Sequence, residues 1–247
     1  MKLLITIPCY NEEIVLEKTV FSITQYAKEY LSEYDWKILI LDNNSNDSTL
    51  EIANRLQSHD SRIIVDQVKN PGRGAALRES WARHDFDIYS YMDADLATDI
   101  KDFSFIVSKV AEGTDIVVGS RYVPYANVKR NLLRKILSSI YNLLLRIVLK
   151  VKFRDAQCGF KAMSKRIVQN MIPKTLDNGW FWDTELMIIS IHFKYSLLEV
   201  PVTWLETRDE LRRSTVSVWS EVIRNLKNIW IMRRRLSQNE YGLEHHI

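Results

Sequence analysis

The sequence predicts an α/β protein whose central sheet is mostly parallel and has helices on both faces. Two patterns in the first 120 residues support this fold class. Short apolar runs rich in β-branched residues recur along the chain, and stretches with helical spacing of apolar residues separate them. Alternating strands and helices of these lengths are typical of a parallel sheet that is covered on both sides.

The expected elements follow one another in a regular order. Strands are predicted at 3–7, 36–41, 62–66, 86–92 and 115–118, with a further strand near 197–204. Helices are predicted at 13–32, 48–57, 74–84 and 100–111. Polar clusters follow four of these strands, at 8–13, 42–48, 93–95 and 119–121. Since ligands bind beyond the carboxyl ends of the strands in such sheets, we expect one binding site at that edge.

The second half of the sequence contains two amphipathic stretches with basic polar faces, 127–150 and 216–236. Helices of this pattern either rest in a membrane interface or pack on the core and turn a basic side to solvent. We expect one α/β domain over 1–215, with 127–150 as an amphipathic interfacial helix within it. A C-terminal amphipathic helix and tail are expected over 216–247.

The composition excludes some classes of protein. Apolar residues make up 46% of the 247 residues, which argues against global disorder, and two cysteines cannot form a disulfide framework. The formal charge is only +3, but basic residues cluster at 129–135, 146–154, 208–213 and 233–235. Such clusters indicate an anionic partner, either a phosphate group or a membrane surface, and no nucleic-acid partner is expected.

No apolar window reaches the length of about 18 residues that a spanning helix requires. The most apolar window, 136–149, is interrupted by Arg146. The first apolar stretch, 3–7, stops at Pro8 and is too short for a signal peptide. We therefore expect a cytoplasmic protein without a transmembrane helix, peripheral on the cytoplasmic face of a membrane.

Asp93 and Asp95 lie directly after the fourth predicted strand, one residue apart. Two carboxylates at a strand end can share one hard divalent cation such as Mg²⁺ or Mn²⁺. Such a cation neutralises a diphosphate, both for binding and as a leaving group. The pair therefore predicts a metal site that serves a nucleotide diphosphate.

Three further segments at the same edge suit a phosphorylated ligand. Asp42 heads a polar run and can accept hydrogen bonds from a ribose or a base, whereas Asp47 is expected to cap the next helix. The glycine loop 70–75 opens a helix, where the backbone can approach an anion and the helix N-terminus favours negative charge. Arg121, after the fifth strand, can bind a phosphate through its guanidinium.

The motifs occur in an order that resembles glycosyltransferase family 2, which has the GT-A fold. They are Pro8-Cys-Tyr-Asn-Glu-Glu13, Asp42 with its Ser/Asn/Asp run, Asn70-x-Gly-Arg-Gly-Ala75, Asp93-Ala-Asp-Leu96 and Gly119-Ser-Arg-Tyr122. Later motifs are similar to the polyprenyl-phosphate branch, and within it to dolichyl-phosphate β-glucosyltransferases: Asp155-Ala-Gln-Cys-Gly-Phe-Lys161, Trp182-Asp-Thr-Glu185 and Val200-Pro-Val-Thr203. The resemblance covers residues 3–220.

The resemblance implies roles for residues in these motifs. The donor, a UDP-sugar and most closely UDP-glucose, would be bound by Pro8, Tyr10, Asn11, Glu12, Asp42, Asn70, Arg73, Asp93 and Gln157. Mg²⁺ or Mn²⁺ would be held by Asp93 and Asp95. The phosphate of a polyprenyl or dolichyl phosphate acceptor would be received by Arg121, Arg134, Ser138, Arg212 and Arg213. Catalysis would involve Asp93, Asp95, Arg121 and Asp183.

The chain departs from the family pattern at two positions. Asn43 stands where a second aspartate is usual, which weakens inference about the base recognised. Thr215 stands where a lysine is usual, so Arg212 or Arg213 would have to supply a positive charge there.

A phosphate monoester has a second pKa of about 6, so it is already a nucleophile at neutral pH and needs no general base. A single in-line displacement would then invert the anomeric centre. Two alternatives remain open. A transferase that acts on a hydroxyl of a glycan or protein would need a base, for which Asp183 or Glu185 is the candidate. A non-catalytic nucleotide- or lipid-binding module is the other alternative.

Overall fold

Seven strands form one central sheet in the computed structural model, which describes residues 1–129, 132–205 and 218–242. Side by side, they are β3 (Ile63–Gln67), β2 (Asp35–Asp42), β1 (Lys2–Cys9), β4 (Ile88–Met92), β7 (Phe160–Ser164), β5 (Ile116–Ser120) and β8 (Leu197–Pro201). Neighbouring strands are parallel except at β7, which runs antiparallel to both β4 and β5. A separate two-stranded sheet pairs β6 (Asn127–Lys129) with β9 (Thr203–Leu205). The predicted mostly parallel sheet is confirmed.

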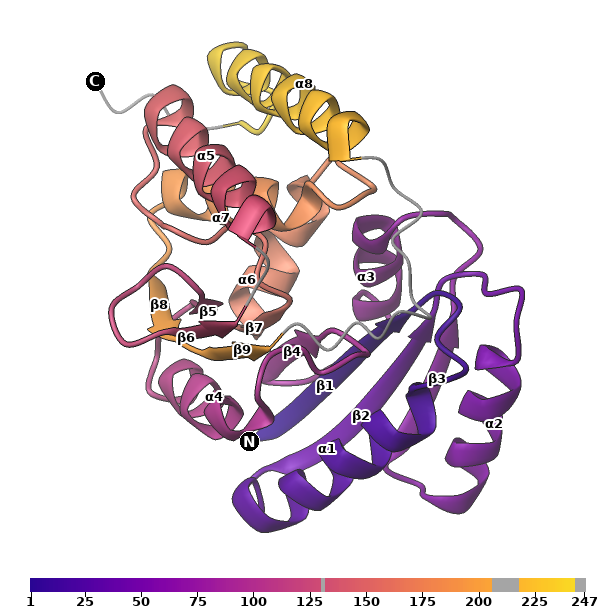
Figure 1. Ribbon diagram of the computed structural model, residues 1–247. Coiled ribbons are helices and arrows are strands. Elements are labelled where there is room, and N and C mark those ends of the chain that lie inside the picture. Colours follow the sequence, from indigo (N-terminus) through magenta and orange to yellow (C-terminus); the bar gives the residue numbers. More distant parts are fainter. Residues whose placement is uncertain (130–131, 206–217, 243–247) are drawn as a thin grey trace.

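Helices cover both faces of the central sheet (Figure 1). One face carries α1 (Leu16–Tyr30), α2 (Thr49–His59) and α4 (Phe103–Ala111), which follows the 3₁₀ helix η1 (Ile100–Asp102). The other face carries α3 (Arg73–Trp81), α6 (Lys165–Asn170), the 3₁₀ helix η2 (Ile172–Lys174) and α7 (Trp182–His192). An outer layer, packed on α7, consists of α5 (Leu132–Leu149) and α8 (Val218–Ser237), which lie side by side.

The inner strands are apolar along most of their length because helices bury both of their faces. Successive side chains on a strand point to opposite faces of the sheet. Thr6 of β1 faces α3, where its hydroxyl accepts a hydrogen bond from Trp81 Nε1 at 2.9 Å. Phe160 of β7 faces α4, where its ring centre lies 5.5 Å from that of Phe103. The two helical layers are thus anchored through alternate residues of the sheet.

The first four predicted helices correspond to α1, α2, α3 and the η1–α4 pair. The region 127–150 differs from the prediction at its start, because residues 127–129 form β6 and the helix begins at Leu132. The sequence did not predict β7 either. This strand enters between β4 and β5 against the direction of both, so its residues are buried by pairing on two sides.

The two outer helices expose apolar side chains. On α5 these residues recur every three or four positions and therefore share one face: Leu132, Ile136, Ile140, Leu143 and Ile147. On α8, Leu226 and Trp230 are exposed as well. Within the part of the chain that the structure describes, no helix combines the length and the apolar character that crossing a bilayer requires.

Gly74 lies where α3 touches α7, and a Cβ atom added there would overlap the Cβ of Trp182. We expect Gly74→Ala to lower the free energy of unfolding by about 1–3 kcal/mol, because the two helices must move apart. Gly179→Ala is the matched control, since its Cβ would meet only Asp177 Oδ1, at an ordinary 3.5 Å. Urea denaturation of both variants measures the difference. Equal stability of the two variants would contradict so close a helix contact.

Candidate active site

The carboxyl end of β4 carries Asp93 and Asp95, where the sequence placed them. The Asp93 N–H donates to the carbonyl of Gly159 at 3.2 Å, so the segment that enters β7 lies directly against Asp93. A Cβ atom on Gly159 would overlap the Asp93 carboxylate, which explains the glycine at this position. The Asp95 carboxylate accepts from the N–H of Ala97 at 3.1 Å. Both aspartates remain partly exposed, so a ligand can reach them.

A buried arginine joins Asp93 to Asp183. Only 8% of the Arg73 side chain is exposed, and its Nη2 lies 3.1 Å from Asp93 Oδ1 and its Nη1 3.9 Å from Asp183 Oδ2. The guanidinium carbon also lies 4.6 Å from the ring centre of Tyr91 and 5.1 Å from that of Trp180. Within the described residues, Arg73 Nε and Nη2 make no hydrogen bond, so the contact of Nη2 with Asp93 is an ion pair without hydrogen-bond geometry. Buried donors are normally satisfied, and the oxygens of an anionic ligand would supply acceptors for these two nitrogens.

Asp183 lies in the first turn of α7, where the helix dipole favours a negative charge. The Tyr91 hydroxyl donates to Asp183 Oδ1, and Lys161 Nζ lies 3.6 Å from the same oxygen. Lys161 is itself buried and donates to the carbonyl of Cys158. Asp93, Asp183, Arg73 and Lys161 form what we call the charge cluster. Its two carboxylates and two cations offset one another's cost of leaving water.

The pKa shifts in the charge cluster follow from burial and from neighbouring charges. Burial raises the pKa of Asp93, although 44% of its side chain stays exposed. The positive charge of Arg73 opposes this rise, whereas the negative charges of Asp95 and Asp183 add to it. Burial alone would lower the pKa of Arg73, but Asp93 and Asp183 hold it above its usual value. Burial, and then Asp183, raises the pKa of Tyr91 well above its usual value. At neutral pH Arg73 is therefore charged and Tyr91 keeps its proton.

The loops after β1 and β2 are hydrogen-bonded to each other. The Asn11 N–H donates to Ser45 Oγ at 3.0 Å, and the Glu12 N–H donates to Thr49 Oγ1 at 2.7 Å. The Tyr10 side chain is 59% exposed, so its ring is accessible to a base. The carboxyl edge thus carries four of the residues to which the resemblance gives a role in binding the nucleotide-sugar: Pro8, Tyr10, Asn11 and Glu12.

Asp42 ends β2 and is fully buried. Its carboxylate accepts from the Ser45 N–H at 3.2 Å and from Gln67 Nε2 at 3.3 Å. Its role in binding the nucleoside stays a prediction, and the structure shows that it also shapes the loop that follows. Asp47 accepts from the Thr49 N–H at 3.0 Å, whereas the N-cap residue of α2 is Ser48, whose side chain makes no capping hydrogen bond.

Asn43, one of the two departures from the family pattern, holds the glycine loop in place. Its Nδ2 donates to the carbonyls of Val68 at 3.1 Å and Asn70 at 2.7 Å, while its Oδ1 accepts from the Gly72 N–H at 2.9 Å. An aspartate has no N–H to donate to those carbonyls. Gly72 has φ = 115° and lies so close to Asn178 that a Cβ atom would overlap its carbonyl oxygen.

Arg121, assigned by the sequence to the acceptor phosphate, forms a buried ion pair with Asp155. Its Nε and Nη2 each donate to the Asp155 carboxylate at 2.8 Å, and its side chain is 10% exposed. Burial raises the pKa of Asp155, but Arg121 reverses this and leaves it below the usual value. Gln157 is anchored to the same carboxylate through its N–H at 3.3 Å. The pair thus fixes the segment that leads to Gly159.

A polar hollow opens on the flank of α5. The Tyr122 hydroxyl donates to Ser138 Oγ, next to a cavity of about 290 Å³. The cavity is lined by Tyr122, Ser139, Asn142, Arg146 and Arg154. Over the described ranges, neither of these two arginines has a carboxylate partner. The described residues do not include Arg212, Arg213 and Thr215, nor the side chain of Arg134.

Sequence reasoning missed several residues of the site. Lys161 is a charged residue in an otherwise apolar strand, and this contrast was a signal that a partner had to lie nearby. Tyr91 and Trp180 come next to Arg73 only through the packing of β4 and α7, which no local pattern reveals. Asn43 was read as a departure from a motif, whereas its amide satisfies three backbone groups.

A mixed sheet of this order, with an Asp-x-Asp pair beyond β4, is the arrangement of a GT-A glycosyltransferase. The chain belongs to glycosyltransferase family 2: the family model described as "Glycosyl transferase family 2" matches residues 4–172. The resemblance seen in the motifs is thereby confirmed.

Named relatives cover most of this chain. Glycosyltransferase AglD of Haloferax volcanii is 32% identical over 225 residues, which are 89% of this chain and 36% of the relative. The dolichyl-phosphate beta-glucosyltransferase ALG5C of Trichomonas vaginalis is 32% identical over 82% of this chain and 64% of its own. A dolichyl-phosphate beta-glucosyltransferase of Saccharomyces cerevisiae is 24% identical over 93% of this chain and 73% of the relative. The chain thus spans 36% of the first relative's length and 64% of the second's.

Solved structures show the same fold. Glucosyl-3-phosphoglycerate synthase from Mycobacterium tuberculosis, in complex with Mn²⁺, UDP and phosphoglyceric acid, matches with a TM-score of 0.63. The alignment covers 99% of this chain and 80% of that one, at 18% identity. At this identity the likeness establishes the fold alone.

The charge cluster gives a direct stability prediction. Arg73→Gln leaves Asp93 and Asp183 without their shared cation, so we expect it to lower the free energy of unfolding by about 2–4 kcal/mol. Arg55→Gln breaks an ion pair with Glu17 whose side chains are 53% and 63% exposed, and should change stability by less than about 1 kcal/mol. Thermal and chemical denaturation compare the two variants. Equal losses would show that the cluster is not held together by Arg73.

Proposed function

We propose that the protein transfers glucose from UDP-glucose to the phosphate of a polyprenyl or dolichyl phosphate, with inversion at the anomeric carbon. The observation that carries this proposal is the buried guanidinium of Arg73 beside the aspartate pair: within the described residues its Nε and Nη2 make no hydrogen bond, although Nη2 forms an ion pair with Asp93. A diphosphate is an anion whose charge and oxygens suit these donors. The relatives named dolichyl-phosphate beta-glucosyltransferase, and solved neighbours in complex with UDP-glucose, support the choice of acceptor and donor.

The aspartate pair fits Mg²⁺ or Mn²⁺, which Asp93 and Asp95 would hold. These hard cations prefer oxygen ligands and often take one or two protein carboxylates, with phosphates and water at their other positions. In the described part of the chain, no three His, Cys, Asp or Glu side chains gather to hold a cation without the substrate. When bound, the cation neutralises the diphosphate and so helps it to leave. Solved neighbours in complex with Mn²⁺ support this choice.

The side chains around the aspartate pair have complementary tasks. Arg73 would bind the diphosphate through Nε and Nη2, while Asp183 would orient the guanidinium through its contact with Nη1. Because Asp183 already accepts from Tyr91 and faces Lys161, we infer that it positions Arg73 and does not take a proton from an acceptor. This favours a phosphate acceptor, which needs no general base, over a hydroxyl of a glycan or protein.

The hollow on the flank of α5 is where the acceptor phosphate would bind. Arg146 and Arg154 supply cationic donors there, Ser138 is hydrogen-bonded to the lining residue Tyr122, and Arg121 directly precedes Tyr122 in the chain. The exposed apolar face of α5 adjoins the hollow, so it would contact the polyprenyl chain or the bilayer. Together with the exposed residues of α8, this face would hold the protein on the cytoplasmic surface of a membrane.

Metal-dependent transfer is tested with radiolabelled UDP-glucose, polyprenyl phosphate and Mn²⁺ or Mg²⁺, scored for an organic-soluble charged glycolipid. We expect Asp95→Asn to lower kcat by about 100-fold, because an amide is a poorer ligand for a hard cation and the leaving diphosphate loses charge stabilisation. Asp99→Asn is the matched control, since the Asp99 side chain accepts from the Lys101 N–H and asparagine caps equally well.

Two results would contradict the proposal in different ways. Extension of a free glycan without labelling of the lipid phosphate would show that the acceptor is a hydroxyl. Failure to turn over any UDP-sugar with either metal would favour a non-catalytic binding module.

The acceptor site is tested by Arg146→Gln and Arg154→Gln. Loss of one charge-assisted hydrogen bond to phosphate should raise the KM for polyprenyl phosphate by about tenfold or more, and leave the KM for UDP-glucose unchanged. Arg83→Gln, in the turn that follows α3 and with Glu79 as its partner, is the control. An unchanged KM for the lipid in both hollow variants would place the acceptor phosphate elsewhere.

A further inference from the structure

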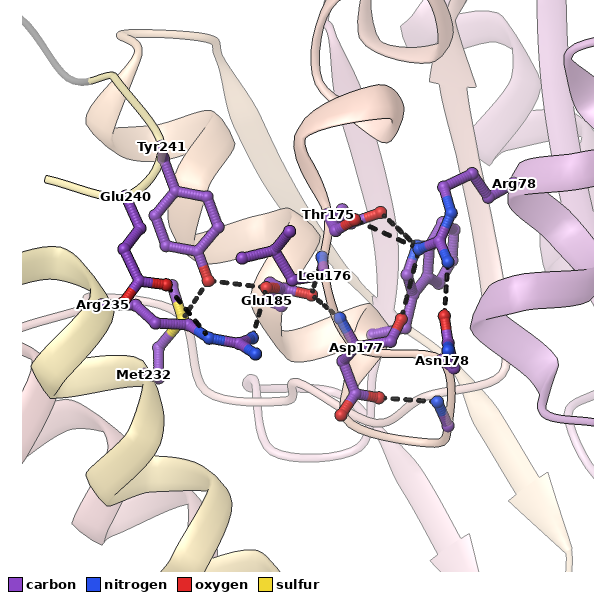
Figure 2. Close-up of polar contacts among 12 residues, drawn as sticks. Arg78, Thr175, Leu176, Asp177, Asn178, Glu185, Met232, Arg235, Glu240 and Tyr241 are labelled. Carbon is purple, nitrogen blue, oxygen red and sulfur yellow. Dashed lines mark hydrogen bonds and ion pairs between the residues drawn. The ribbon is translucent and has the colours of Figure 1, made fainter.

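The carboxylate of Glu185 joins two segments that are distant in the sequence (Figure 2). Its Oε2 accepts from the backbone N–H groups of Leu176 at 3.0 Å and Asp177 at 2.7 Å. Its Oε1 accepts from the Tyr241 hydroxyl at 2.6 Å and from Arg235 Nη1 at 3.3 Å. One oxygen thus holds the loop before α7, and the other holds α8 and the residues after it.

The loop that Glu185 holds is also fastened to α3. Arg78 Nη1 donates to the carbonyl oxygen of Thr175 at 3.1 Å and to its hydroxyl at 3.2 Å, and Nη2 donates to the side chain of Asn178. The Asn178 carbonyl accepts from the Ala75 N–H at 3.1 Å. Figure 2 shows this sequence of contacts running from Tyr241 through Glu185 to Arg78. The loop therefore lies between the C-terminal helix and the helix that begins with Arg73.

The same loop reaches the charge cluster. Trp180, which follows it, places its ring 5.1 Å from the Arg73 guanidinium. The Asn178 carbonyl lies against Gly72, the residue directly before Arg73. A shift of residues 176–180 would therefore move both the backbone that precedes Arg73 and the ring beside its guanidinium.

Glu185 is suited to hold this loop and not to act as a base. It is fully buried, and within the described residues its partners are two backbone amides, a phenol and a guanidinium, none of which belongs to the charge cluster. Burial raises the pKa of Tyr241, and Glu185 raises it further, so the phenol remains a donor. A buried carboxylate with four donors has its lone pairs engaged, and removing any partner leaves charge unsatisfied.

We propose that Glu185 is a positioning residue that couples the seating of α8 on the domain to the geometry of the donor site, through residues 176–180 and Arg73. Because α8 also carries the exposed Leu226 and Trp230, the contact links the surface offered to a membrane with the diphosphate site. The donor readout below rests on the proposed function, whereas the exchange readout does not.

The test uses the full chain with Glu185→Gln and, as a milder change, Tyr241→Phe, which removes one donor to Glu185 and keeps the ring. Hydrogen–deuterium exchange of residues 175–181 should accelerate about tenfold in both variants, since the Leu176 and Asp177 amides lose a firmly held acceptor. The Kd for UDP with Mn²⁺, and the KM for UDP-glucose, should each rise about three- to tenfold. The pH profile of kcat should keep its shape.

Two substitutions of the same kind, away from residues 175–181, serve as controls. Glu112→Gln changes a carboxylate whose partner is Lys109, and Tyr195→Phe removes a hydroxyl that accepts from Asn170. Both should leave the exchange of 175–181 and the KM for UDP-glucose unchanged. If Glu185→Gln fails to fold, Tyr241→Phe decides the question alone.

The possible outcomes separate the inference from the proposed function. Unchanged hydrogen–deuterium exchange of residues 175–181 in Tyr241→Phe would overturn the coupling. A lower melting temperature with an unchanged KM for UDP-glucose would overturn it too, because Glu185 would then have a purely structural role. Loss of one limb of the pH profile in Glu185→Gln would also overturn it, because Glu185 would then be a base. If the unmodified protein binds neither UDP nor Mn²⁺, the proposed function fails while the exchange result still decides the coupling.

Discussion

The structure depends on the contacts of two buried cations, Arg73 and Lys161, with the buried Asp183 and the partly exposed Asp93. Each of these ions is costly to remove from water, and the cost is offset only because opposite charges and the Tyr91 hydroxyl lie within reach. Close approach of the backbone is needed at several points around them. Glycines at 72, 74 and 159 provide it, since a Cβ atom at each would overlap a neighbouring segment.

The antiparallel strand β7 is what brings the cluster to one place. The strand lies between β4 and β5. Gly159, directly before it, contacts Asp93, and Lys161, its second residue, forms an ion pair with Asp183. Alternation along the strand sends Phe160 to α4 on the opposite face. A single short strand thus supplies one side of the cluster and part of the core below the sheet.

Much of this was readable in the sequence. The periodicity of apolar residues located the first five strands and the helices between them, because these elements are determined by local burial on both faces of the sheet. Because Asp93 and Asp95 directly follow the fourth of these strands, their place at the carboxyl edge of the sheet could be predicted as well. What local patterns did not give are the contacts between distant segments: the insertion of β7, the partnership of Lys161 with Asp183, and the use of Glu185 as an acceptor for both a loop and α8. These depend on topology, which spacing alone does not encode.

The central claim is that Arg73 and the aspartate pair together receive the diphosphate of a nucleotide-sugar. A crystal structure of the protein with UDP-glucose and Mn²⁺ tests it most directly. The account predicts diphosphate oxygens within hydrogen-bonding distance of Arg73 Nε or Nη2, with the cation bound to Asp95 or Asp93. A donor or cation bound elsewhere, with Arg73 still contacting only Asp93 and Asp183, would contradict it.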